Sequence, residues 1–86
     1  RGDYRGAAQK FEKLLRLAGN RYPDALLRLA DSYYNLGDYG RAKRLYLRFI
    51  RLFPKDKDIS DAYLGLVNLY LATGDISLAD YVYRIV

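Results

Sequence analysis

A short turn sequence recurs three times along the 86-residue chain. Its copies are Gly2-Asp3-Tyr4, Gly37-Asp38-Tyr39 and Gly74-Asp75-Ile76, which begin 35 and 37 residues apart. Glycine adopts the left-handed conformation that ends a helix, and the aspartate after it can accept hydrogen bonds from the free amides that open the next helix. Each copy is therefore predicted to be a tight turn between two helices, and the spacing predicts a stack of similar helix pairs.

Apolar residues recur at steps of three and four positions on both sides of each turn, which is the period of a helix with one buried face. No segment shows a sustained period of two, so we expect no β-sheet. Five helices are predicted, at residues 4–18, 23–36, 39–53, 59–73 and 76–86. Pro23 stands at the start of the second, where its missing amide costs least.

This pattern resembles the tetratricopeptide repeat (TPR) family, whose unit is two antiparallel helices in about 34 residues. The central pair carries most of the resemblance, at Leu26, Leu29, Ala30, Tyr33, Gly37, Ala42, Tyr46 and Pro54. The next pair matches at Tyr63, Leu66, Tyr70, Gly74, Ala79 and Tyr83. The resemblance implies an all-α, right-handed α-solenoid of antiparallel helix pairs, with about two and a half repeats in five helices.

The Gly-Asp-Tyr turn and the tyrosines Tyr33 and Tyr70 favour this family over its closest rival, the RNA-binding pentatricopeptide repeats, whose period fits equally well. Five tyrosines fall at core positions of the TPR pattern, namely Tyr33, Tyr46, Tyr63, Tyr70 and Tyr83. They are predicted to be packing residues. Tyr34 points about 100° away from Tyr33 around the helix and is predicted to face the inner surface instead.

Residues 1–86 are predicted to form a single TPR-like segment, which contains three parts. Residues 1–22 are expected to be the second helix of a truncated repeat, residues 23–58 a complete repeat, and residues 59–86 a repeat truncated at its C-terminal end. Because the chain opens in mid-repeat without a methionine, we expect it to be a fragment of a longer protein. Residues 44–54 have a narrower resemblance to repeats of bacterial envelope assembly lipoproteins.

Few side chains are available for catalysis. The chain has no histidine and no cysteine, which excludes catalytic triads, thiol nucleophiles and the commonest zinc sites. Its seven glycines are scattered and form no phosphate-binding loop. Asp56 and Asp58 lie in a lysine-flanked loop that is predicted to be solvated. We therefore expect no enzyme, no metal and no cofactor.

The resemblance implies that the first helix of each pair lines an inner, concave groove that binds another protein. The predicted groove residues on helices 23–36 and 59–73 are Asp24, Leu27, Asp31, Tyr34, Asn35, Asp61, Leu64, Asn68 and Leu71. The surface is mildly acidic, and its Asn35 and Asn68 amides can bond a peptide backbone. We expect a non-catalytic scaffold that holds a neutral or basic peptide or helix. Some TPR domains hold acidic C-terminal tails with a cage of cations. This surface lacks such a cage, so we do not expect it to bind acidic C-terminal tails.

The outer helix of the central pair is basic, and its exposed cations are predicted to be Arg41, Lys43, Arg44, Arg48 and Arg51. Residues 1–57 have a net charge of +8 and residues 58–86 a net charge of −3, within the total of +5. Nucleic acid or an anionic membrane is therefore an alternative partner. The stripe lacks interleaved aromatic residues for base stacking, so simple solvation is favoured over either partner.

Self-association through exposed faces of the terminal repeats is a further alternative, because apolar surface that has lost its neighbour drives association. The longest apolar runs fall short of the roughly 18 residues that a membrane-spanning helix needs. The sequence indicates no cellular compartment.

Overall fold

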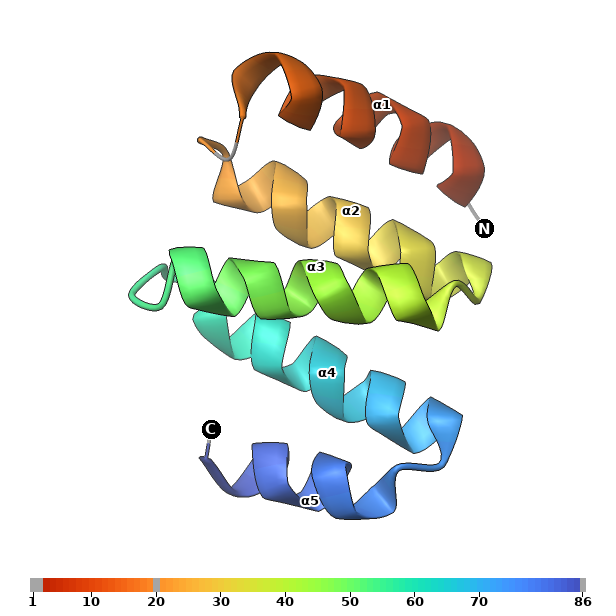
Figure 1. The fold of residues 1–86 in the computed structure, drawn as a ribbon, viewed down its shortest axis with the longest axis vertical. Coiled ribbons are helices and arrows are strands. Elements are labelled where there is room, and N and C mark those ends of the chain that lie inside the picture. The colour runs from red at the N-terminus through yellow and green to blue at the C-terminus, as the bar shows by residue number, and fades with distance from the viewer. Residues whose placement is uncertain (1–2, 20, 86) are drawn as a thin grey trace.

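The computed structural model describes residues 3–19 and 21–85, and within them the chain forms five helices (Figure 1). These are α1 (Tyr4–Ala18), α2 (Pro23–Leu36), α3 (Tyr39–Leu52), α4 (Ile59–Thr73) and α5 (Ile76–Ile85). The bounds agree with the predicted helices within one residue, and no strand occurs in the described part of the chain. The all-α prediction is confirmed. None of the described helices is both long and apolar enough to span a bilayer.

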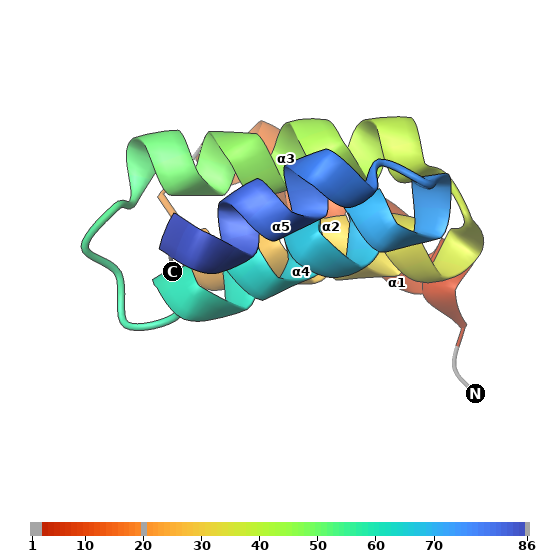
Figure 2. The ribbon, with the colours of Figure 1, turned by 90° about the horizontal axis from the view of Figure 1, so that it is seen from below.

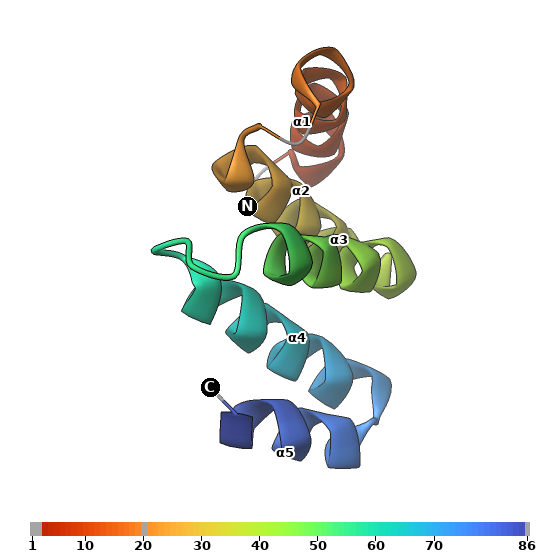
Figure 3. The same cartoon turned by 60° about the vertical axis from the view of Figure 1, so that its left-hand side comes forward.

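Consecutive helices pack side by side in chain order, so α1 and α5 lie at opposite ends of the stack (Figures 1 and 3). Cα atoms of α2 and α4 also approach within 8 Å, whereas none do so between α1 and α3 or between α3 and α5 in the described residues. The stack is therefore tighter on the side of α2 and α4, which we call the inner side. The opposite side is called the outer side. The predicted solenoid of antiparallel helix pairs is confirmed.

Two glycine turns, between α2 and α3 and between α4 and α5, reverse the chain on the same side of the stack, and the loop that joins α3 to α4 lies on the opposite side (Figure 2). Gly37 and Gly74 both have a φ of 85°, in the left-handed region. The amide of Asp38 bonds the Tyr33 carbonyl at 2.9 Å, and the amide of Asp75 bonds the Tyr70 carbonyl at 2.8 Å. The predicted role of these glycines is confirmed. Gly2 of the first turn sequence and Val86, the last residue of the predicted helix 76–86, lie outside the described residues.

The core lies between the helices of the stack and contains most of the predicted packing residues. Tyr33, Tyr46 and Tyr70 are buried, and Tyr63 is half-buried. Tyr83 is 66% exposed, so its predicted core position is wrong. Among the described helices α5 packs against α4 alone, and the face that carries Tyr83 meets no other helix.

Candidate binding surfaces

A shallow hollow of about 260 Å³ lies between α2 and α4 on the inner side of the stack. Six of the nine predicted groove residues line it, namely Asp31, Tyr34, Asn35, Asp61, Leu64 and Asn68. Tyr46 of α3 and Gly65 of α4 complete its wall. The structure thus joins the two halves of the predicted groove, which come from different helix pairs.

Gly65 explains how α4 comes close enough to complete this hollow. A Cβ atom at this position would lie 2.5 Å from two ring carbons of Tyr46 and 2.9 Å from its hydroxyl. Real Cβ atoms do not approach other atoms so closely, so a larger residue would push the ring or the helix away. Sequence reasoning did not single out Gly65, because a glycine inside a helical pattern carries no signal of what it touches.

The Tyr46 hydroxyl donates a hydrogen bond to the Asp31 carboxylate. Burial raises the pKa of Asp31, and the nearby Asp61 raises it further, while the Tyr46 hydrogen bond and Arg28 act in the opposite direction. Burial and the Asp31 acceptor also raise the pKa of Tyr46 strongly. The phenol therefore stays a neutral donor, and the hollow presents two carboxylates that repel each other and attract cations.

Two amides and a leucine supply the rest of the inner surface. The Asn35 amide nitrogen donates to the Asp31 main-chain oxygen at 2.8 Å, which leaves its carbonyl oxygen as an acceptor. Asn68 is exposed, and its amide bonds no other described side chain. Leu64, one helical turn before Asn68, is 45% exposed. Tyr34 is half-buried with its ring centroid 5.5 Å from that of Tyr39.

Three predicted groove residues do not line the hollow. Leu27 is only 7% exposed and belongs to the core, so its assignment to the groove is wrong. The reason is that α2 is packed by α1, α3 and α4 together, which leaves little of its surface open. Asp24 is exposed beside Arg28, with 2.9 Å between its carboxylate and the guanidinium, and Leu71 is exposed further along α4.

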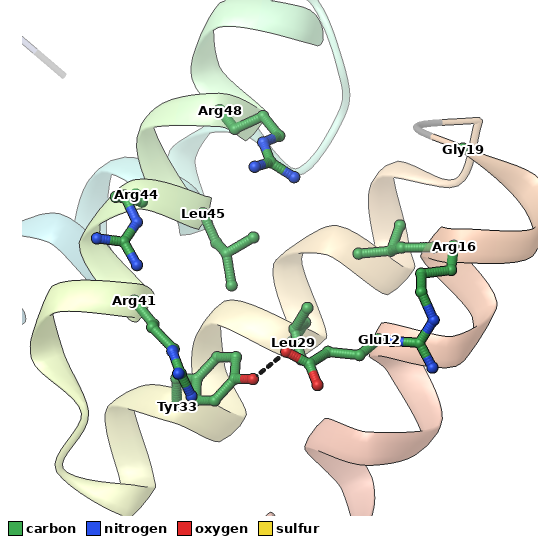
Figure 4. A pocket seen from close by; sticks show the side chains of 10 residues that line it. Glu12, Arg16, Gly19, Leu29, Tyr33, Arg41, Arg44, Leu45 and Arg48 are labelled. Atoms are coloured by element: carbon green, nitrogen blue, oxygen red, sulfur yellow. Dashed lines mark hydrogen bonds between the residues drawn. The ribbon is translucent and has the colours of Figure 1, made fainter.

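A larger hollow of about 410 Å³ opens on the outer side, between α1 and α3, and Leu29 and Tyr33 of α2 also line it (Figure 4). Arg41, Arg44 and Arg48, three of the five predicted outer cations, line it. Lys43 instead lines a depression against α4, and Arg51 is exposed outside both hollows. The five predicted cations therefore do not form one continuous basic surface.

The opposite wall of this outer hollow comes from α1, which the sequence analysis left out. Arg16 and Glu12 of α1 line it, and the Tyr33 hydroxyl donates a hydrogen bond to Glu12 (Figure 4). Burial, followed by the Glu12 acceptor, raises the pKa of Tyr33. Arg16 could have been identified from the sequence, because the 35-residue spacing of the repeats makes it equivalent to Arg51, which was among the predicted outer cations.

The described residues contain no cluster of three side chains able to hold a metal ion. The carboxylates of the inner hollow stand beside a phenol and amides, which are hydrogen-bonding groups. Both hollows present hydrogen-bonding groups, charged groups and apolar surface.

The fold and these surfaces define a protein built from stacked helix pairs. Residues 24–56, which span most of α2, all of α3 and part of the following loop, match the family model of the tetratricopeptide repeat. The predicted resemblance to that family is confirmed over this pair. The narrower likeness to bacterial lipoproteins stays a prediction.

Plant proteins are among the relatives of the chain. The DnaJ protein P58IPK homolog of Arabidopsis thaliana is 35% identical over 71 residues, which are 83% of this chain and 14% of that protein. DnaJ protein P58IPK homologs B and A of Oryza sativa subsp. japonica are 42% identical over 50 residues, or 58% of this chain and 11% and 10% of those proteins. The chain spans at most 14% of the length of these relatives. No solved structure matches it significantly.

Proposed function

We propose that this chain is a non-catalytic protein-interaction module whose inner hollow holds a neutral or basic peptide or helix of a partner. The observation that carries the proposal is the hollow itself, which joins an exposed leucine, two amides and two carboxylates from successive helix pairs. TPR repeats are in general protein-interaction modules, and the match over residues 24–56 supports that role here. Within this proposal, residues 23–58 form one complete repeat between two partial ones.

The chemistry of the inner hollow selects the kind of ligand. Leu64 offers apolar surface, while Asn35 and Asn68 can bond the carbonyls and amides of a peptide backbone. Asp31 and Asp61 lie close enough for the charge of one to shift the pKa of the other. A cationic side chain placed between them would relieve this repulsion, whereas an added carboxylate would increase it.

A selection from a displayed library of random 12-residue peptides tests the proposal. Enriched peptides are titrated against the chain by fluorescence anisotropy, with Leu64→Ala as the variant and Leu78→Ala as its matched control. These two leucines have nearly equal exposure, 45% and 46%, but Leu78 lies on α5 outside the hollow. We expect Leu64→Ala alone to weaken binding, and Asp61→Asn to weaken the basic peptides among those selected.

Two outcomes speak against this function. If Leu78→Ala weakens binding as much as Leu64→Ala, the peptides do not use the inner hollow. If the enriched peptides are acidic, the inferred charge preference is wrong.

Self-association is the second candidate function, and the apolar surface of α5 favours it. The exposed large side chains of this helix are Ile76, Leu78, Tyr81, Tyr83 and Ile85. Analytical ultracentrifugation over a concentration series tests it, with Tyr81→Ser/Ile85→Ser as the variant and Leu47→Ser, an exposed leucine of the central helix α3, as the control. We expect association that only the α5 variant reduces. A monomer at every concentration excludes this candidate.

A further inference from the structure

The outer hollow combines an apolar floor with a basic rim. Leu29 and Leu45 are buried side chains of its lining, and Leu15 is half-buried beside them. Leu45 and Arg48 project from α3 into the space between α3 and α1 (Figure 4). Its volume, about 410 Å³, lies within the range of about 300–1,000 Å³ that is usual for ligand sites. The hollow therefore has room for an apolar side chain.

Four arginines and one carboxylate surround this floor, so its net charge is positive. Among the described residues Arg16, Arg44 and Arg48 form no ion pair, and Arg41 reaches Asp38 only at 3.5 Å. Glu12 is the one carboxylate of the described lining, and it already accepts the Tyr33 hydroxyl. The guanidinium groups thus retain donors for an external anion, and arginine binds carboxylates with paired, charge-assisted hydrogen bonds.

We propose that the outer hollow is a second binding site, which takes an acidic peptide segment with one apolar side chain. The apolar side chain enters between α1 and α3 and covers Leu29 and Leu45, while carboxylates beside it bond the arginines of both walls. This site is separate from the inner hollow and has the opposite charge preference. It does not depend on the function proposed for the inner hollow.

The same geometry disfavours nucleic acid and lipid at this site. Base recognition on single strands relies on open aromatic faces, but the Arg41 guanidinium lies 5.5 Å from the centroid of the Tyr33 ring and occupies that face. A bilayer presents a broad surface, whereas the apolar groups here lie at the bottom of a recess between two helices. A flexible peptide side chain can enter such a recess.

The probe is a fluorescein-labelled peptide with one central leucine flanked by aspartate and glutamate, with both termini blocked. Anisotropy is measured with the 86-residue chain and with two single variants, one for each wall of the hollow. Arg48→Gln has Arg51→Gln as its control on α3, and Arg16→Gln has Lys13→Gln as its control on α1. Each pair removes the same charge from the same helix, and circular dichroism verifies that the helices remain.

We expect Arg48→Gln and Arg16→Gln each to weaken binding by about tenfold, and the two controls to weaken it by less than about twofold. Replacing the leucine of the peptide by serine should also weaken binding by about tenfold, because the floor then stays uncovered. Equal losses in variants and controls, or equal binding of the serine peptide, would show diffuse attraction and overturn the proposal. Tighter binding of a single-stranded oligonucleotide or of phosphatidylserine vesicles, with the same dependence on Arg48 and Arg16, would replace the peptide as the ligand and overturn it too.

Discussion

The Tyr46 hydroxyl of α3 donates a hydrogen bond to Asp31 of α2, and the Tyr46 ring lies against Gly65 of α4. One residue of the outer helix therefore contacts both inner helices. Tyr46 is almost fully buried, and it also lines the inner hollow. Packing of the core and the shape of the proposed peptide site consequently depend on the same side chain.

Gly65→Ala should destabilise the chain. The new Cβ would lie 2.5 Å from the Tyr46 ring, so the ring or α4 must move, at a cost of about 1–3 kcal/mol for an overpacked core. The higher helix propensity of alanine offsets up to about 1 kcal/mol of this. Urea denaturation measures the net change in the free energy of unfolding.

Gly40→Ala is the matched control for this substitution. Gly40 lies in the first turn of α3, and a Cβ there would meet no described atom within 4 Å beyond its chain neighbours and the adjoining backbone of its own helix. Alanine at this position should therefore leave stability unchanged or raise it by up to about 1 kcal/mol. If both variants change stability by the same amount, Gly65 is not required for the contact between α4 and Tyr46.

Asp31→Asn should stabilise the chain at pH 7 and have less effect at pH 3. The pKa of Asp31 is raised above its ordinary value of 3.8, chiefly by burial, so folding favours the protonated form. Protonated Asp31 therefore stabilises the fold fully below pH 3.8, and this stabilisation is lost as the pH rises through the raised pKa. Asparagine is always neutral and keeps an oxygen that can accept the Tyr46 hydroxyl. Because the side chain is partly solvated, we expect the gain at pH 7 to be below about 1 kcal/mol.

Thermal unfolding at the two pH values measures this difference, with Asp80→Asn as the control. Asp80 is an exposed aspartate of α5 whose carboxylate lies 2.9 Å from the Arg84 guanidinium. Its replacement removes a surface ion pair and should lower stability at pH 7 by no more than about 0.5 kcal/mol. The same gain for Asp31→Asn at pH 3 and at pH 7 would contradict the assigned role of its charge.

Local signals in the sequence were sufficient to predict the helices and turns. Gly37 next to Asp38 predicts where α2 ends and α3 begins, and Pro23 marks the start of α2, without knowledge of the neighbouring helices. The same periodicity cannot fix how many helices surround a given face. Leu27 is buried because three helices pack around α2, and Tyr83 is exposed because, of the helices that the structure describes, α5 packs against α4 alone.

The candidate sites were predictable to the extent that their residues share a helix face. Asp31 and Asn35, or Leu64 and Asn68, stand four positions apart, so each pair had to lie together. Contacts between helices were not accessible from this periodicity. The Tyr46–Asp31 hydrogen bond and the Gly65 contact both depend on how far three helices approach one another, and so does the meeting of Arg16 with Arg48 across the outer hollow.

Gly37→Ala should lower the free energy of unfolding by about 1–2 kcal/mol, because the residue has a φ of 85° and alanine is strained in the left-handed region. Apart from its two chain neighbours, no described residue comes within 4 Å of a Cβ built at this position, so the cost comes from the backbone alone. Gly37→Asn should cost less, because asparagine adopts this conformation more readily than alanine does. Chemical denaturation compares the two variants, and an equal loss for alanine and asparagine would contradict a purely conformational cause.

An acidic peptide with a free C-terminal carboxylate should not bind the inner hollow. A carboxylate needs converging cationic or amide donors, but here it would meet Asp31 and Asp61. Arg28 is the one cation of α2 and α4, and it is paired with Asp24 at 2.9 Å. Titration of such a peptide and of its C-terminally amidated form, followed by anisotropy, measures the contribution of the carboxylate.

Any binding of these acidic peptides should come from the outer hollow and should be equal for the two forms. It should fall in the Arg48→Gln variant and stay unchanged in Asn68→Ala, since Asn68 lines only the inner hollow. The opposite pattern, with tighter binding of the free-acid form that Asn68→Ala removes, would show that the inner hollow accepts a carboxylate. In that case the two aspartates would not control its choice of ligand, because the Asn68 amide would outweigh their repulsion.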